Sequence, residues 1–299
     1  MGVITRSFPP HPNPLPPGER VGHSSPQQSW GVFWHILIKG CYPVLVDSHA
    51  HLEMPEFKKD LEEVVLRAKK SGVEYIFTVG TEKKDWKRAL EISHSHPGVF
   101  AILGVHPHNA KEIDDRTYPI LKDLCRNEKV RAYGEIGLDF FRNHSPREVQ
   151  IKRFREQIAL AKELHLPIVI HDRDAHEETL EILKSEKAEV YGGIIHCFSG
   201  DYRMAKECID MGFYISVPGT ITFKNAGEFQ EIVRNLPLES LLVETDAPFL
   251  APVPFRGKRN EPGFVPYTAQ KIAELKKVPF EKVAEVTTQN AMEVFKIHT

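Results

Sequence analysis

Eight short β-rich segments, separated by longer stretches in which apolar residues recur at helical spacing, constrain the fold of this chain more than any other feature. The segments lie at 44–47, 74–79, 99–105, 130–136, 167–171, 191–196, 212–217 and 240–245. The helical spacing is clear at Leu61, Val64, Val65 and Ala68, just before Gly72. Strands that alternate with helices predict a parallel sheet with helical crossovers.

The number of strand–helix units indicates how such a sheet is arranged. An open, doubly wound sheet would also satisfy the alternation, but eight units within about 250 residues favour closure into a barrel. We therefore expect an α/β fold, a (β/α)8 TIM barrel, over residues 44–299. One more amphipathic helix is expected from 278 to 297.

Residues 1–43 differ in composition from the rest of the chain. Proline is dense between Ser7 and Gly18, and proline prevents both helix and sheet hydrogen bonding. The apolar run at 30–38 is shorter than the ~20 residues of a membrane span, and it follows the proline tract, unlike a signal peptide. We expect a Pro-rich, disordered extension here, or a stretch translated from an upstream start.

Charge and cysteine content exclude several classes of protein. The formal net charge of −2 argues against a surface coated in basic charge, so a polyanion would be held by a local patch or by bound metal. The four cysteines form no CxxC pair, which argues against a disulfide scaffold and favours a reducing cytoplasm. The sequence predicts neither membrane association nor an obligate protein partner.

Metal-ligand residue types fall at the ends of the predicted strands. His49 and His51 follow the first strand, and five more residues end later strands: His106, Glu135, His171, His196 and Asp246. The carboxyl ends of barrel strands meet at one face, so these side chains are expected to form one cup. An isolated HxH pair lies in a solvated loop about as often as it binds a metal. Here the other ligand-type residues at strand ends favour metal binding.

The composition of this set indicates its chemistry. Residues i and i+2 of an extended segment share a face, so His49 and His51 can bind one ion. Hydrolysis by a divalent ion requires three or more N/O ligands and an open position for water. The set is large enough for two ions that share Glu135 as a ligand. Asp246 is suitably placed to be both a metal ligand and the general base. Cys197, next to His196, is expected to be a buried structural thiol on the opposite face of its strand.

These motifs together resemble the TatD family of metal-dependent deoxyribonucleases. The resemblance covers DSHAHL (47–52), GVHPH (104–108), GEIGLD (134–139), HCFSG (196–200), ETDAPFL (244–250) and RGKRNEP (256–262), with His171. It implies an amidohydrolase-type barrel with two divalent ions, which could be zinc, manganese or magnesium. By resemblance, one ion binds His49, His51, Glu135 and Asp246, and the other binds Glu135, His171 and His196.

The resemblance and the ligand set predict an enzyme, a metal-dependent hydrolase that cleaves DNA phosphodiesters from an end. Asp246 and Glu135 are the catalytic candidates. An alternative on the same centre is ester hydrolysis of D-aminoacyl-tRNA, and a third is a metal-binding scaffold without turnover. Candidate substrate-binding residues are His106, Lys224, Arg256, Lys258 and Arg259. For the four basic residues, ordinary solvation is an equal interpretation. Four aromatic residues near the motifs could stack on bases or pack the rim: Phe140, Phe141, Phe198 and Phe249.

Overall fold

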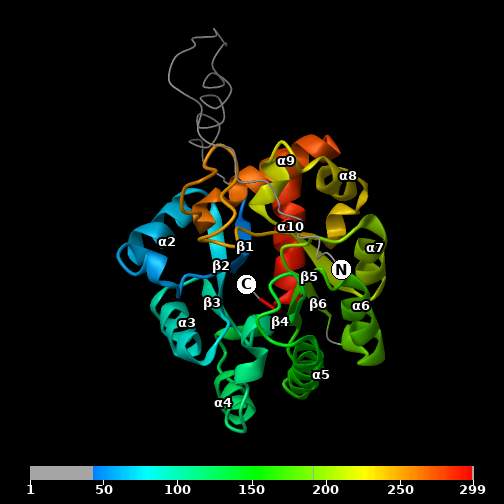
Figure 1. Ribbon diagram of the computed structural model, residues 1–299. Coiled ribbons are helices and arrows are strands. Elements are labelled where there is room, and N and C mark those ends of the chain that lie inside the picture. Colours follow the sequence, from blue (N-terminus) through cyan, green and yellow to red (C-terminus); the bar gives the residue numbers. More distant parts are fainter. Residues whose placement is uncertain (1–42, 191, 298–299) are drawn as a thin grey trace, which may run out of the picture. The chain divides into compact units, whose positions relative to one another are not determined.

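Eight parallel strands form the centre of the computed structural model, which describes residues 43–190 and 192–297 (Figure 1). Each strand pairs with the next one along the chain, in the order β1 to β8. The expected (β/α)8 barrel and all eight expected strands are confirmed. The strands are β1 (Leu45–Ala50), β2 (Val73–Gly80), β3 (Val99–Leu103), β4 (Val130–Asp139), β5 (Ile168–Arg173), β6 (Gly193–Ile195), β7 (Phe213–Val217) and β8 (Leu241–Val243).

The barrel closes where β1 meets the segment after β8. The backbone N–H of Asp246 donates to the carbonyl of His49 at 2.9 Å. The buried carboxylate of Asp47 accepts hydrogen bonds from the backbone N–H of Thr245 at 2.9 Å and from its hydroxyl at 2.6 Å. Burial raises the pKa of Asp47 to about 8, although the Thr245 donors act in the opposite direction. We call these β1–β8 contacts the seam.

Helices cover the outside of the barrel. Of the α2 residues predicted from their spacing to face the core, Leu61, Val64 and Ala68 are buried, and Val65 is partly buried against the core. The Asp201 carboxylate caps α7 by accepting from the backbone N–H of Met204 at 2.7 Å. The helices are α2 (Leu61–Lys70), α3 (Lys83–Ser95), α4 (Thr117–Leu124), α5 (Arg147–Glu163), α6 (His176–Ser185), α7 (Tyr202–Asp210), α8 (Gly227–Asn235), α9 (Val265–Lys276) and α10 (Phe280–Val294). Short 3-10 helices are η1 (Pro55–Phe57), η2 (Pro107–Glu112), η3 (Ala188–Val190), η4 (Gly219–Thr222), η5 (Leu238–Ser240) and η6 (Pro262–Phe264).

The barrel interior contains its own apolar cluster. It includes one or more inward-facing residues from most strands, among them Phe77, Val169, Ile194 and Leu242, and the end of α10 packs against it. The ring of Phe295 stacks on Phe77 with centroids 3.6 Å apart. Since side chains of a strand alternate between faces, residues two positions further along also point inward. Polar residues occupy those positions at the carboxyl ends.

The described residues, 43–190 and 192–297, belong to one compact unit. The Pro-rich extension expected over 1–43 lies outside the described residues, except for Pro43. The expected C-terminal helix is present as α10. Among the described residues, no helix has the length and apolar character needed to cross a membrane.

Candidate metal centre

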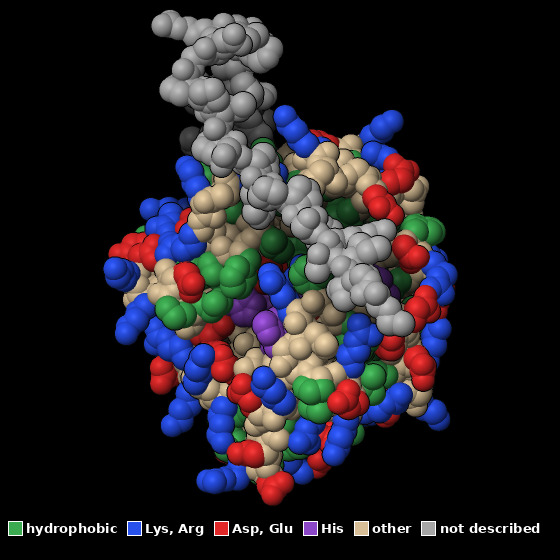
Figure 2. Space-filling model, viewed as in Figure 1, with side chains coloured by type: hydrophobic (Ala, Val, Ile, Leu, Met, Phe, Trp, Pro, Cys, Tyr) green, Lys and Arg blue, Asp and Glu red, His purple; other side chains and the backbone are tan. Residues whose placement is uncertain are grey.

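A cup of about 910 Å³ opens at the carboxyl ends of the strands. Figure 2 shows histidine side chains at a hollow near the centre of this face, with basic side chains beside them. Of the metal-ligand candidates, five line the cup directly: His51, Glu135, His171, His196 and Asp246. His49 lies beneath them and is 1% exposed. The structure therefore brings all six predicted ligand residues to one place.

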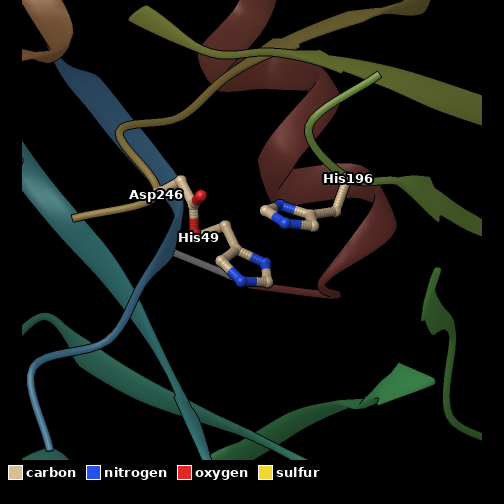
Figure 3. A group of neighbouring side chains, drawn as sticks. All are labelled: His49, His196 and Asp246. Atoms are coloured by element: carbon tan, nitrogen blue, oxygen red, sulfur yellow. The ribbon is translucent and has the colours of Figure 1, made fainter. Parts of the chain in front are cut away.

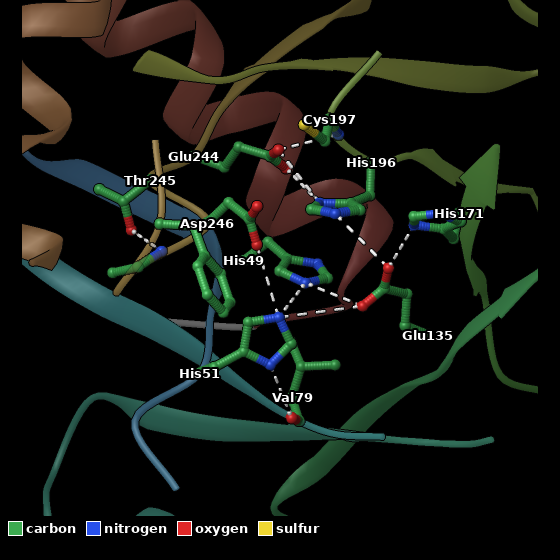
Figure 4. A network of polar contacts seen from close by, with 12 residues as sticks. His49, His51, Val79, Glu135, His171, His196, Cys197, Glu244, Thr245 and Asp246 are labelled. Atoms are coloured by element: carbon green, nitrogen blue, oxygen red, sulfur yellow. Dashed lines mark hydrogen bonds and ion pairs between the residues drawn. The ribbon is translucent and has the colours of Figure 1, made fainter. Parts of the chain in front are cut away.

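The inner atoms of this cluster converge. His49 Nε2 lies 3.3 Å from His51 Nε2 and 3.4 Å from a Glu135 oxygen. His51 Nε2 lies 3.4 Å from a carboxylate oxygen of Asp246 (Figure 4). The rings of His49 and His196 stack at 3.5 Å beside the Asp246 carboxylate (Figure 3).

The outer ring nitrogen of His51 faces two acceptors. His51 Nδ1 lies 3.2 Å from the Glu53 carboxylate and 3.2 Å from the Val79 carbonyl. Both partners accept hydrogen bonds, so in the neutral ring the proton belongs on Nδ1. The Nε2 lone pair then points at the carboxylates of Asp246 and Glu135 inside the cup. Lone pairs that face carboxylate oxygens at this range require a cation or an added proton between them.

The same arrangement recurs at His196 and His171. His196 Nδ1 lies 3.1 Å from the Glu244 carboxylate, which also accepts from the backbone N–H of Cys197 at 2.8 Å. His171 Nε2 lies 3.1 Å from Asp139, and its Nδ1 lies 2.8 Å from Glu135. A carboxylate behind each imidazole fixes the ring and makes the inner nitrogen a better ligand, as in many metal sites.

Electrostatics favour a positive occupant. Burial by itself raises the pKa of Glu135, but the surrounding histidines outweigh it and hold the pKa well below its ordinary value. Burial lowers the pKa of His171, yet hydrogen bonds to Asp139 and Glu135 raise it to about 9 overall. The cup therefore concentrates negative charge that a cation would neutralise. The donor set of imidazole nitrogens and carboxylate oxygens fits a divalent ion such as zinc or manganese.

The possible ligands fall into overlapping groups whose atoms lie within 4.8 Å of one another. Glu135 joins two of these groups, one with His49 and His51 and one with His106 and His171. Another contains His49, His196 and Asp246, and a fourth contains His196, Cys197 and Glu244. Thus Glu135 lies at the junction of the histidine sets, as a shared ligand would.

His106 lines the cup and faces Glu135, and its predicted substrate-binding role stays a prediction. Its Nδ1 accepts from the backbone N–H of His108 at 3.1 Å, so its proton belongs on Nε2, 3.4 Å from Glu135. Burial lowers the pKa of His106 to about 4, which keeps the ring neutral. The geometry favours a neutral donor that orients Glu135.

The four predicted basic substrate residues lie outside the lining of the cup. Lys224 is exposed, and the Arg256 guanidinium covers the ring of Phe223 at 4.5 Å. Lys258 lies 5.9 Å from the Phe255 ring centroid. Arg259 donates to both carboxylate oxygens of Asp60, at 2.8 and 2.6 Å. The geometry thus favours a structural role for Arg259, and the substrate roles of the four stay predictions.

Cys197 differs from the buried thiol that we expected. It is partly exposed and lines the cup, and its φ of 45° is left-handed. Because β6 ends at Ile195, strand alternation no longer determines where this side chain points. Burial of its sulfur raises the pKa of the thiol well above the ordinary value, so Cys197 is not a ready thiolate.

The sequence reasoning found the inner residues of the centre and missed the carboxylates behind them, Glu53, Asp139 and Glu244. Strand alternation could have found Glu244, since it stands two positions after the inward-facing Leu242 and two before Asp246. Glu53 lies in the turn after β1, and Asp139 is the last residue of β4. At such positions the two-residue period of a strand does not predict where the side chain points.

Comparison with known proteins identifies the family. Residues 46–296 match the family model described as TatD related DNase. The chain belongs to the TatD family. It is a metal-dependent hydrolase of that family, as the resemblance implied.

Individual TatD relatives agree with this assignment. The metal-dependent hydrolase YabD of Bacillus subtilis is 48% identical over 85% of this chain and 100% of its own length. The protein named 3'-5' ssDNA/RNA exonuclease TatD of Erwinia tasmaniensis is 36% identical, over 85% of this chain and 100% of its own. The solved structure of YjjV, a TatD homologue of Escherichia coli, has a TM-score of 0.80 and 32% identity, covering 85% of this chain and 98% of that one.

Proposed function

We propose that this TatD-family chain is a nuclease that releases nucleotides from an end of DNA with two divalent ions. The observation that carries the proposal is the position of Glu135, whose two oxygens face separate histidine sets. The relatives named as exonucleases support a nucleic acid substrate. No contact among the described residues specifically favours aminoacyl-ester hydrolysis.

The ligand sets that we propose follow the convergence of inner atoms. His49, His51, Glu135 and Asp246 would hold one ion, and Glu135, His171 and His196 would hold the other. Ions bound there would lower the pKa of coordinated water and neutralise charge on phosphoryl oxygens. Glu53, Asp139 and Glu244 each accept a hydrogen bond from the outer ring nitrogen of one histidine: His51, His171 and His196, respectively. This contact favours the tautomer that leaves the inner ring nitrogen free to bind an ion.

Asp246 is the residue that we assign to proton transfer. Its side chain is 14% exposed at the wall of the cup, so it can reach a substrate. Burial alone would raise its pKa, but the facing His51 and other histidines lower it overall. A carboxylate that is ionised at neutral pH can accept a proton from water during attack and pass it to the leaving oxygen.

We also propose that residues 44–299 form the catalytic unit, in a cytoplasmic protein. The full length of YabD matches only 85% of this chain, and the family match begins at residue 46. The thiols of Cys125, Cys197 and Cys208 are free, which suits a reducing compartment. Deletion of residues 1–43 should therefore leave the rate of hydrolysis unchanged, as measured on the purified, metal-loaded protein.

The test of the function is one assay on two substrates. Metal-reconstituted protein is given DNA oligonucleotides labelled at either end, beside D-aminoacyl-tRNA. The proposal expects stepwise shortening of DNA that chelation abolishes. Intact DNA together with deacylated tRNA would show that the protein is a D-aminoacyl-tRNA deacylase instead. If neither substrate is hydrolysed, the alternative of a metal-binding scaffold without turnover would be favoured.

A further inference from the structure

One aromatic side chain of the rim is set apart by its surroundings. Phe141 follows β4 in the loop to α5, at the same end of the barrel as the metal centre. It is 53% exposed, whereas its neighbour Phe140 is 7% exposed and packs in the core. A single exposed ring is ordinary on a protein surface, so exposure by itself indicates no site.

Two arginines flank that ring. The guanidinium carbon of Arg173 lies 4.0 Å from the ring centroid of Phe141, and that of Arg142 lies 5.4 Å from it. Both arginines are exposed and line the cup. Across residues 43–190 and 192–297, no ion pair joins either of them to a carboxylate. These cations therefore face solvent and the cup.

The two acidic residues at the ends of β4 and β5, Asp139 and Asp172, contact histidines. Asp139 faces His108 at 2.9 Å and His171 at 3.1 Å, and Asp172 pairs with His176. Their negative charge is therefore shared with imidazoles. Among the described residues, neither guanidinium has a carboxylate within ion-pair distance, although the net charge of the protein is −2.

This group is fixed to the metal centre. The backbone N–H of Phe140 donates to the carbonyl of Arg173 at 2.9 Å, which ties the β4 loop to the end of β5. One oxygen of Asp139 accepts from the backbone N–H of Arg142 at 2.6 Å, and the other lies 3.1 Å from His171 Nε2. One carboxylate thus positions both a candidate metal ligand and the flanking arginine.

We propose that Phe141, Arg142 and Arg173 form a nucleotide subsite for single-stranded nucleic acid. An unpaired base takes the place of a guanidinium over the Phe141 ring, and the two guanidiniums bind the phosphate next to that base. An aromatic face beside cations is the arrangement by which proteins hold single strands without reading their sequence. Bases in a duplex are stacked on each other and cannot reach the ring. This subsite rests on the proposed nuclease function and assigns its substrate contacts.

The chain provides a matched control at the opposite end of the barrel. Phe100, at the start of β3, has Lys129 at 5.1 Å and Arg131 at 5.2 Å from its ring centroid. The residue types are the same, but Phe100 is partly buried against Phe77, and among the described residues no possible metal-ligand group lies at the amino ends of the strands. If the loss of any aromatic ring beside cations changed DNA binding in general, Phe100 variants would show the same change in binding as Phe141 variants.

The experiment measures binding of fluorescent single-stranded DNA to the metal-free protein, with intact oligonucleotides and with oligonucleotides abasic at both ends. The wild type should prefer the intact strand by roughly 5- to 150-fold, the range for one stacked base. Phe141→Leu should lose that preference, while Phe100→Leu should keep it. Arg173→Gln should reduce the slope of log affinity against log salt by about one, and Arg131→Gln should not.

Equal preference for the intact strand in wild type and Phe141→Leu would overturn the subsite. So would equal effects of the Phe141 and Phe100 substitutions. Measurements of turnover distinguish failure of the subsite proposal from failure of the proposed nuclease function. If the metal-loaded wild type hydrolyses bis(p-nitrophenyl) phosphate but leaves single-stranded DNA intact, the nuclease function fails, and the subsite fails with it. If DNA is degraded with equal KM by wild type and Phe141→Leu, only the subsite fails.

Discussion

The two ends of the barrel interior use the same inward-facing positions in opposite ways. At the amino end Phe77 and Leu242 are fully buried, and Phe295 of α10 covers Phe77. Two residues after Leu242 comes Glu244, which is equally buried but faces His196. β8 ends at Val243, so Glu244 lies just past the strand, and within two positions the buried side chain changes from apolar to charged.

This contrast separates stability from activity along a single strand. Buried rings stabilise the fold through the removal of apolar surface from water. Buried carboxylates and imidazoles gain little stability, because desolvation offsets their mutual attraction. Substitutions at the two ends should therefore affect different measurements, and the following four substitutions test that expectation.

The largest effect is expected for Glu135→Gln at the carboxyl end. The amide cannot supply a shared negative ligand, so metal content should fall and hydrolysis should be abolished. The free energy of unfolding of the metal-free protein should change by no more than about 1 kcal/mol, because the isosteric amide still accepts hydrogen bonds. Elemental analysis, rates and urea denaturation provide the three measurements. Full metal occupancy with normal turnover would show that Glu135 is not a shared ligand.

Phe77→Ala at the amino end should have the reverse effect. Truncation of a fully buried aromatic ring costs about 3–5 kcal/mol of unfolding free energy. Metal affinity and KM of the folded protein should stay unchanged, since Phe77 lies in the apolar cluster. Urea denaturation and metal titration measure both quantities, with Phe77→Leu as a milder variant should the alanine form not fold. If Phe77→Ala instead lost metal affinity while its free energy of unfolding stayed unaltered, the proposed division between a stabilising amino end and a metal-binding carboxyl end would be wrong.

Glu244→Gln should weaken metal binding without abolishing it. Loss of the carboxylate behind His196 makes the imidazole a poorer ligand, and such changes typically reduce metal affinity by about 10–100-fold. Saturating metal should restore most of the rate. Glu239→Gln, on the exposed surface just before β8, is the matched control and should change neither quantity. Loss of rate that excess metal cannot restore would place Glu244 in the chemistry itself.

The smallest effect is expected for Arg259→Gln, a residue near the site whose contacts are structural. The hydrogen bonds from Arg259, and then those from Arg67, lower the pKa of Asp60 to about 2 despite its partial burial. An ion pair of this exposure contributes about 0–1 kcal/mol. Because the folded pKa is depressed, that contribution is complete above pH 3.8 and is lost as the pH falls towards 2.

Urea denaturation of wild type and Arg259→Gln at several pH values checks this sign. The stabilities of the two proteins should differ at pH 7 and converge as the pH falls to 2 and below, and their DNA affinities at pH 7 should be equal. If the substitution instead reduces the salt slope of DNA binding by about one, Arg259 binds a phosphate, as its motif alone suggested.

Local periodicity predicted the strands, the strand ends predicted the inner residues, and tertiary contacts determined the rest. His171 and His196 could be placed in the cup because each ends a predicted strand and the carboxyl ends of barrel strands meet at one face. No local pattern reveals that Arg259 pairs with Asp60, which is 199 positions away in the sequence. The left-handed backbone at Cys197 likewise breaks the alternation on which its predicted burial depended.

The seam between β1 and β8 has a consequence for protein synthesis. His49 leaves the ribosome early, whereas its seam partner Asp246 is made nearly 200 residues later. Until then a nascent chain holds the HxH pair without the carboxylate that completes its cluster. Because metal affinity depends on a folded ligand set, we expect tight binding only after Asp246, which follows β8, has been translated. We therefore expect truncated chains that end before Leu241 to bind metal weakly.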